Sequence, residues 1–180
     1  GEKRHGFRSY LCYKAVVDEI KGNGPKGRRR GDFRTVASWP DEKGYIRVVE
    51  GPEFGWMKNP DDFFCQSFRI GNDSNSMGIR LEATETPIAL SVEQEMISQA
   101  VSDGTVQLTQ GGPVILLRDR QTLGGYPRIF NVISVDLDML AQVGPFERIR
   151  FRKVTHDQAL DALRRWQDDL DRIKKCVSNE

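Results

Sequence analysis

The stretch RDRQTLGGYPR, residues 118–128, decides how the rest of the chain is interpreted. It is preceded by the apolar run Pro113–Leu117 and followed by Ile129–Val135, which is rich in β-branched residues. Short apolar runs bounded by turn-forming residues are typical of buried strands. The sequence therefore predicts two buried strands that are joined by this loop.

The loop combines glycines with polar side chains. Gly124 and Gly125 permit positive φ angles and a close approach of the backbone to a ligand, and Pro127 fixes the exit of the loop. Charged groups, an amide and hydroxyls surround these residues: Arg118, Arg120, Arg128, Gln121, Thr122 and Tyr126. Such groups suit an acceptor-rich or anionic small molecule. The alternative is a tight, solvated strand connection whose glycines serve only the turn.

The composition limits the class of protein. The 180 residues suffice for one domain or two small lobes, and 38% hydrophobic with 29% charged residues is typical of a soluble globular protein. A net charge of +1 gives no overall attraction to nucleic acid or to an anionic membrane. No apolar stretch approaches the roughly 20 residues of a membrane helix. The basic run at residues 26–30 lacks aromatic neighbours and is expected to be a solvated loop, so we expect neither nucleic acid nor membrane as a partner.

The cysteines indicate the compartment. Cys12, Cys65 and Cys176 lie far apart, without the spacing of a disulfide framework or a metal site. This usage fits a reducing compartment, and the first residues do not resemble a signal peptide. We therefore expect a cytoplasmic protein.

Short strands are expected along the whole chain, from runs of β-branched and aromatic residues. They lie at Phe7–Val17, Tyr45–Glu50, Met77–Leu81, Thr105–Leu108 and Glu147–Val154. Asp61–Ile70, with its phenylalanines, suits a short helix or a strand that packs aromatic rings. Arg80 should point to the side opposite Ile79 and Leu81, because side chains alternate along a strand.

Helices are expected at three places. Ser91 and Gln94 form a capping-box pattern for a helix ending near Val101, and Asp136–Gln142 forms one or two turns. Thr155 caps a C-terminal helix whose apolar stripe is expected to pack on the barrel rather than on a partner: Leu160, Leu163, Trp166, Leu170 and Ile173. Many short strands without βαβ alternation predict a β-rich barrel or sandwich-like domain with peripheral helices.

The usual catalytic templates do not fit. The two histidines, His5 and His156, cannot build a triad or a histidine-rich metal site, and no phosphate-binding loop or dinucleotide fingerprint is present. What remains is a set of arginines with amides: Arg80, Arg118, Arg120, Arg128, Asn75 and Gln121. Such groups orient a carbonyl or carboxylate and stabilise developing negative charge, but they supply no nucleophile.

Several segments in order resemble the allophanate hydrolase subunit 2 family, which includes the C subunit of 5-oxoprolinase and part of the carboxyltransferase domain of urea carboxylase. The segments are GPE at 51–53, SNSMGIRL at 74–81, DRQTLGGYP at 119–127, VIS at 132–134 and RF at 150–151. GFRSYL at 6–11 resembles the family's G-x-R-x-Y-L strand, and the match covers most of residues 46 to 154.

This resemblance implies a mainly β fold, a cyclophilin-like β-barrel with a few peripheral helices, one of them C-terminal. Residues 1–45 would be the remnant of an N-terminal lobe with a flexible basic loop, and residues 46–180 the barrel with its helix. It also implies partners, namely a barrel of the subunit 1 or B type that shares a cleft with this chain, and the lactamase-type A subunit.

The implied activity is that of a component similar to the C subunit of an ATP-dependent 5-oxoprolinase, a hydrolase component that is inactive without its partners. The first alternative is the carboxyltransferase component of a biotin-dependent urea carboxylase or allophanate system. The second is a non-catalytic regulatory module of the kinase-inhibitor-antagonist type. This chain itself is expected to bind no cofactor, so ATP would be used by a partner and carboxybiotin would be carried on another chain.

The resemblance also implies site residues. Catalytic or orienting roles fall to Arg80, Gln121 and Tyr126. Substrate binding falls to Asn75, Arg118, Arg120, Thr122, Gly124 and Gly125, and no metal ligands are expected.

The chain departs from the family pattern at several positions. Ser76 stands where an arginine is usual, Gln99 where a glutamate is usual, and Leu123 where a second threonine is usual. Each change weakens the expected chemistry of the cleft and favours the non-catalytic alternative. The chain also begins inside the family's usual length, which indicates a fragment or a shortened member.

Overall fold

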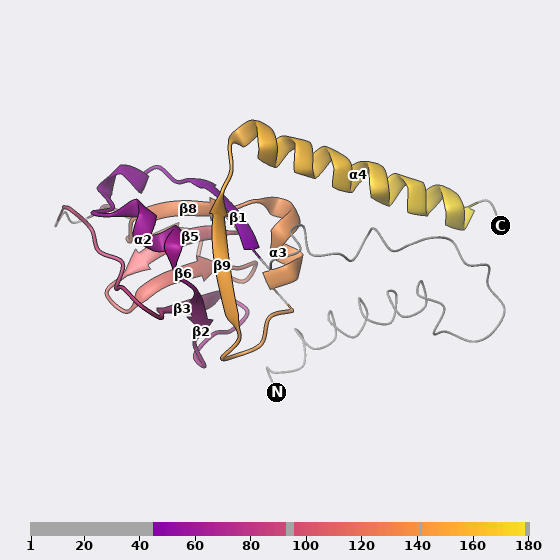
Figure 1. The fold of residues 1–180 in the computed structure, drawn as a ribbon. Coiled ribbons are helices and arrows are strands. Elements are labelled where there is room, and N and C mark those ends of the chain that lie inside the picture. Colours follow the sequence, from indigo (N-terminus) through magenta and orange to yellow (C-terminus); the bar gives the residue numbers. More distant parts are fainter. Residues whose placement is uncertain (1–44, 93–95, 141, 179–180) are drawn as a thin grey trace.

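The computed structural model describes residues 45–92, 96–140 and 142–178. Within them seven strands form a closed barrel in the order β1-β8-β5-β6-β3-β2-β9. The strands are β1 (Tyr45–Glu50), β2 (Phe68–Ile70), β3 (Gly78–Ala83), β5 (Thr105–Thr109), β6 (Gly112–Leu116), β8 (Arg128–Val132) and β9 (Arg148–Lys153). The predicted mainly β barrel is therefore confirmed (Figure 1).

The barrel closes through one parallel pair. β1 runs parallel to β9, with Ile46 opposite Phe151, whereas the other barrel strands pair antiparallel. Closure satisfies the backbone hydrogen bonds that an open sheet would leave at its edges. β9 follows the alternation expected from sequence, because Ile149 and Phe151 are buried while its arginines face outward.

An aromatic cluster lies in the core of the barrel. The short helix α2 (Pro60–Cys65) inserts Phe63, whose ring centroid lies 4.8 Å from that of Phe68, 4.6 Å from Phe130 and 4.7 Å from Phe151. All four side chains are almost fully buried. Asp61–Ile70 thus contains both predicted possibilities, since α2 is followed directly by β2.

A buried carboxylate fixes the change from strand to helix after β8. Asp136, in the first turn of α3 (Ser134–Leu140), is completely buried and accepts hydrogen bonds from the backbone N–H of Arg47 at 2.7 Å and from its guanidinium at 2.6 Å and 3.1 Å. The predicted strand Ile129–Val135 is consequently too long, because it ends at Val132 and α3 begins at Ser134.

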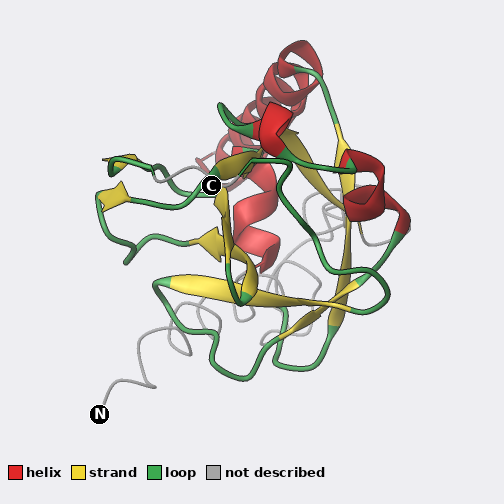
Figure 2. Cartoon of the chain, turned by 90° about the vertical axis from the view of Figure 1, so that its left-hand side faces the viewer, coloured by secondary structure: helices red, strands yellow, loops and turns green. Residues whose placement is uncertain are grey.

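The predicted helix from Ser91 to Val101 is wrong in the residues that the structure describes. Gln99–Ala100 forms β4, which pairs antiparallel with β7 (Leu123–Gly124) in a ribbon outside the barrel (Figure 2). Pairing with the 118–128 loop prevails over the capping-box pattern, a tertiary contact that local sequence does not show. Two predictions lie outside the described residues, namely the strand Phe7–Val17 and the basic loop. The proposed division at residue 45 lies at the border of the described part.

The C-terminal helix α4 (His156–Ser178) extends away from the barrel (Figure 1). Its predicted capping box is confirmed, because Thr155 Oγ1 accepts from Gln158 N–H and Gln158 Oε1 accepts from Thr155 N–H. The prediction that its stripe packs on the barrel is wrong, since Leu160, Leu163 and Trp166 remain 38–49% exposed. α4 contacts α3. In the described part of the chain, no helix has the length and apolar character needed to cross a membrane.

Candidate functional site

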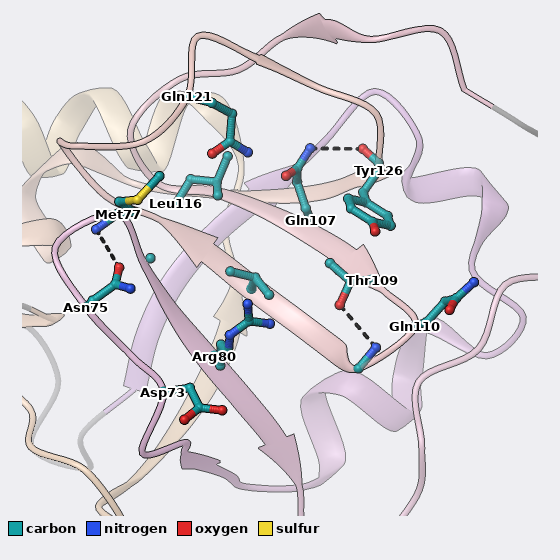
Figure 3. Close-up of a pocket in the computed structure, with 13 residues that line it drawn as sticks. Asp73, Asn75, Met77, Arg80, Gln107, Thr109, Gln110, Leu116, Gln121 and Tyr126 are labelled. Atoms are coloured by element: carbon teal, nitrogen blue, oxygen red, sulfur yellow. Dashed lines mark hydrogen bonds between the residues drawn. The ribbon is translucent and has the colours of Figure 1, made fainter.

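A cavity of about 390 Å³ opens at the outer face of β3, β5 and β6. Its walls come from the turn before β3, from the β5–β6 hairpin and from the 118–128 loop, which lies across it (Figure 3). Among the described residues of the lining, the charged side chains are Arg80 and Asp73, and the others are amides, a phenol, a hydroxyl, apolar groups and glycines.

The turn before β3 holds one wall in place through its own side chains. Ser74 Oγ donates to the carbonyl of Gly71 at 2.8 Å and accepts from the backbone N–H of Arg80 at 3.0 Å. Asn75 Oδ1 accepts from the N–H of Met77 at 2.9 Å, which leaves its amide nitrogen for the cavity. The predicted turn-forming residues therefore fix the positions of Asn75 and Arg80 through hydrogen bonds within the turn.

Arg80 projects into the cavity from the middle of β3 (Figure 3). Ile79 and Leu81 on either side are buried, so the predicted alternation is confirmed. In the described residues no carboxylate forms an ion pair with Arg80, unlike Arg47, Arg120 and Arg128, which are all paired. A guanidinium that has no ion-pair partner in the described residues can bind a carboxylate or a polarised carbonyl of a ligand.

The 118–128 loop supplies the opposite wall. Its backbone is tied down where Val101 N–H donates to the carbonyl of Thr122 at 3.1 Å and Leu108 N–H donates to that of Pro127 at 2.9 Å. Gln121 and Tyr126 both line the cavity and are exposed to it. The loop backbone is therefore held at two points, Thr122 and Pro127, while these two side chains remain available.

Gln107 is a cavity residue that sequence reasoning missed. It lies on β5, is only 2% exposed, and its Nε2 donates to the carbonyl of Tyr126 at 3.2 Å (Figure 3). Its position could have been noticed in the sequence, because it is a polar amide within the predicted strand Thr105–Leu108 and a buried polar group needs a hydrogen-bond partner. Thr109 and Asp73 also line the cavity and were not predicted.

Arg118 and Arg120 of the loop do not face the cavity. Arg120 Nη1 forms an ion pair with the buried Oδ1 of Asp103 at 2.6 Å, although the angle does not meet hydrogen-bond criteria. The Nε of Arg120 donates a hydrogen bond to the carbonyl of Val101. Arg118 is 82% exposed on its side chain and 4.0 Å from Asp138. These two residues, predicted to bind substrate, do not line the cavity.

Arg128 is held by a largely buried carboxylate. Its Nε and Nη2 donate to the two oxygens of Glu53 at 2.9 Å and 2.8 Å, and its backbone N–H donates to Glu53 Oε2 as well. The side-chain hydrogen bonds from Arg128 lower the pKa of Glu53 below its ordinary value, and the same bonds raise the pKa of Arg128. This pair fixes the exit of the loop against the segment that follows β1.

The paired glycines have a different role from the predicted one. Positive φ angles in glycines of the described part occur at Gly104 and Gly112, not at Gly124 or Gly125. A Cβ atom at Gly124 would lie 2.4 Å from Nε2 of Gln107, whereas one at Gly125 would meet Ser98 Oγ at an ordinary 3.6 Å. Gly124 therefore permits close contact with Gln107, and neither glycine lines the cavity.

The structure thus brings together four of the predicted site residues, namely Asn75, Arg80, Gln121 and Tyr126. The other predicted residues lie outside the cavity lining: Arg118, Arg120, Thr122, Gly124 and Gly125. One cation, two amides and a phenol in this arrangement can bind and orient a small polar molecule and stabilise negative charge on it. Among the described residues, no three His, Cys, Asp or Glu side chains cluster as metal ligands.

Known proteins with similar sequences share this region. The family model described as carboxyltransferase domain, subdomain A and B, matches residues 18–153. The 5-oxoprolinase C subunit of Haemophilus influenzae is 33% identical over 138 residues, which is 75% of this chain and 44% of that protein. The 5-oxoprolinase C subunit of Escherichia coli is 31% identical over 209 residues, 98% of this chain and 66% of that protein. The chain therefore spans about half to two thirds of the length of these relatives.

Solved structures show the same fold. The crystal structure of the urea amidolyase of K. lactis superposes with a TM-score of 0.66 at 21% identity, covering 71% of this chain and 8% of that one. The urea carboxylase of Kluyveromyces lactis gives the same TM-score and identity over 12% of its chain. The family model covers well over half of the sequence, so the chain belongs to the carboxyltransferase domain family, subdomain A and B.

Proposed function

We propose that this chain acts as the C-type component of an ATP-dependent 5-oxoprolinase and that it binds the substrate in the cavity beside β3. The observation that carries the proposal is the convergence of Asn75, Arg80, Gln121 and Tyr126 on one cavity from two separate segments. The two relatives named as 5-oxoprolinase C subunits supply the substrate class.

The cavity chemistry suits 5-oxoproline, a small lactam with a carboxylate. Arg80, which has no ion-pair partner in the described residues, is placed to bind the carboxylate or to stabilise negative charge on the lactam oxygen. The amides of Asn75 and Gln121 offer donors and acceptors that orient the ring. No described lining residue is arranged as an activated nucleophile, so we propose that the groups that break the bond lie outside the described lining.

The partners are proposed on the same basis. Two of the lining residues, Met77 and Tyr126, keep exposed side chains, which a barrel of the subunit 1 or B type would cover in a shared cleft. ATP would be bound and used by the lactamase-type A subunit, and this chain would contribute orientation and charge stabilisation.

Reconstitution tests this proposal. The chain would be combined with the B-type barrel protein and the A-type lactamase protein encoded by the same organism, and 5-oxoproline-dependent ATP hydrolysis would be measured with and without it. We expect hydrolysis coupled to glutamate formation only when all three are present. Equal rates without this chain would reject the proposal.

A second candidate is a carboxyltransferase component of a biotin-dependent urea carboxylase or allophanate system, favoured by the description of the matching family model. The cavity would then receive a carboxybiotin carried on another chain, with Arg80 against the transferred carboxylate. Carboxyl transfer to urea in a reconstituted mixture distinguishes the two, because the 5-oxoprolinase proposal predicts none.

A further inference from the structure

Gln107 has an unsatisfied acceptor inside the cavity. Its Nε2 donates to the carbonyl of Tyr126, but its Oε1 accepts no hydrogen bond from any described residue. In the described part, the one side-chain polar atom that is both sealed from solvent and without a hydrogen bond is Asp103 Oδ1. Gln107 Oε1 is therefore open to the cavity that its residue lines.

A second buried glutamine shows what a purely structural amide does in this fold. Gln66 is also 2% exposed, and its Nε2 donates to the carbonyls of Asp62 and Thr86. Its Oε1 accepts from the N–H groups of Glu85 and Thr86, so it leaves no acceptor unused. Gln107 is equally buried but keeps its acceptor free, which is costly unless a ligand or water completes it.

The orientation of the Gln107 amide is fixed by its surroundings. If the amide were turned over, Oε1 would face the carbonyl oxygen of Tyr126, and two acceptors would repel each other. The packing of Gly124 against Nε2 leaves no room for the amide to move toward the loop. An immobile acceptor therefore faces the cavity in which Arg80 presents its cation (Figure 3).

We propose that Gln107 Oε1 selects ligands by accepting a hydrogen bond from a ring or amide N–H, so that the cavity takes lactams and rejects the isosteric lactones. This inference rests on the proposed function in one respect, namely that this cavity is the ligand-binding site. A lactone places a ring oxygen against Oε1, which leaves the buried acceptor unpaired, and sites built for a hydrogen bond discriminate strongly against such analogues. Asp73 is the one acidic residue in the described lining, and unlike the buried Gln107 it is exposed to solvent.

The test compares two ligands that differ in one ring atom. 5-Oxoproline and 5-oxotetrahydrofuran-2-carboxylate share the carboxylate and the carbonyl, and differ only in N–H against O. Their affinities would be measured by calorimetry and by saturation-transfer NMR, with the full chain alone and with its B-type barrel partner. The variants are Gln107→Met, which keeps the side-chain length without polar atoms, and Gln142→Met as the matched control.

Gln142 is a suitable control because its amide also donates to a backbone carbonyl, that of Asp138 at 3.0 Å, but lies outside the cavity. We expect the wild type and Gln142→Met to prefer the lactam by at least about tenfold, and Gln107→Met to bind both compounds equally. Gly124→Ala, which displaces the amide without removing it, should also reduce the preference and serves if Gln107→Met does not fold. Loss of the Tyr126 hydrogen bond alone would weaken both ligands together and leave their ratio unchanged.

The outcomes separate this inference from the proposed function. An unchanged preference in Gln107→Met, no preference in the wild type, or no binding of either compound in either preparation would overturn the inference. A Gln107-dependent preference without 5-oxoproline-dependent ATP hydrolysis in the reconstituted complex would support the inference and reject the 5-oxoprolinase proposal. If the reconstituted complex hydrolyses ATP in the presence of 5-oxoproline but the preference for the lactam is the same in Gln107→Met, the 5-oxoprolinase proposal is supported and the inference about Gln107 is rejected.

Discussion

Gly124 of the loop and Gln107 of the barrel lie so close that a Cβ atom at Gly124 would stand 2.4 Å from Gln107 Nε2. The contact joins β7, in the ribbon outside the barrel, to β5 in its wall. Because Gln107 also holds the carbonyl of Tyr126, the position of one cavity residue depends on the absence of a side chain at Gly124. The glycine is therefore explained by packing against an amide rather than by its backbone angles.

Replacing Gly124 should consequently cost more than replacing its neighbour. Gly124→Ala forces the Gln107 amide to move and should destabilise the protein by about 1–3 kcal/mol, the usual cost of overpacking. A Cβ atom in Gly125→Ala makes only ordinary contacts, with Ser98 and Met96, and the variant should change the free energy of unfolding little. Urea unfolding of both variants checks this, and equal effects would contradict the role given to Gly124.

The Glu53–Arg128 pair predicts a specific dependence of stability on pH. The folded pKa of Glu53 lies below its ordinary value, chiefly because Arg128 donates side-chain hydrogen bonds to it. The pair therefore contributes fully above the unfolded pKa of about 4.5, and the contribution is lost as pH falls through the folded pKa. Glu53→Gln should lower the stability at pH 7 by about 3 kcal/mol, because the pair is largely buried, and should reduce the loss on acidification.

Glu50→Gln is the matched control for this measurement. Glu50 pairs with Lys153 at 2.9 Å, but both side chains are about half exposed. Surface pairs contribute about 1 kcal/mol or less, so this variant should keep the acid sensitivity of the wild type. Unfolding by urea from pH 7 to pH 3 distinguishes the two, and identical pH profiles for both variants would show that the Glu53 pair has no special role.

Because the apolar stripe of α4 is exposed, we expect substitutions in it to have little effect on the free energy of unfolding, unlike substitutions in a helix that packs on a core. Leu163→Ser should change the free energy of barrel unfolding by about 0.5 kcal/mol or less, because Leu163 is already partly solvated. Phe63→Ala, at the centre of the aromatic cluster, should cost about 3–5 kcal/mol. Thermal unfolding compares them, and a loss of several kcal/mol in Leu163→Ser would show that the stripe packs on the barrel in solution.

Much of the barrel was predictable because strand alternation and turn chemistry are local. β1, β3, β5, β6 and β9 lie where β-branched and aromatic runs indicated them, and Thr155 with Gln158 caps α4 as the pattern requires. The amphipathic stripe of α4 was visible too, but periodicity shows only that a helix has an apolar face, not what covers it.

The partners of charged residues were not predictable in the same way. Arg128 is paired with Glu53, 75 residues away in sequence, and Arg120 with Asp103 across β4–β7. Both looked like ligand contacts from the loop sequence alone, because long-range ion pairs leave no local pattern. Gln107 was missed for the converse reason, since a single amide in a strand gains significance only when its free oxygen is seen to face a cavity.

The central claim is that the cavity beside β3 binds the substrate through Arg80 and Gln121. The most direct measurement is kcat/KM for 5-oxoproline in the reconstituted complex, for Arg80→Ala, for Arg80→Ala with Gln121→Ala, and for Arg148→Ala, which removes an exposed arginine of β9 outside the cavity. The account predicts a loss of about 100-fold for Arg80→Ala, a further loss in the double variant, and wild-type activity for Arg148→Ala. Unchanged kcat/KM in the folded double variant would contradict it.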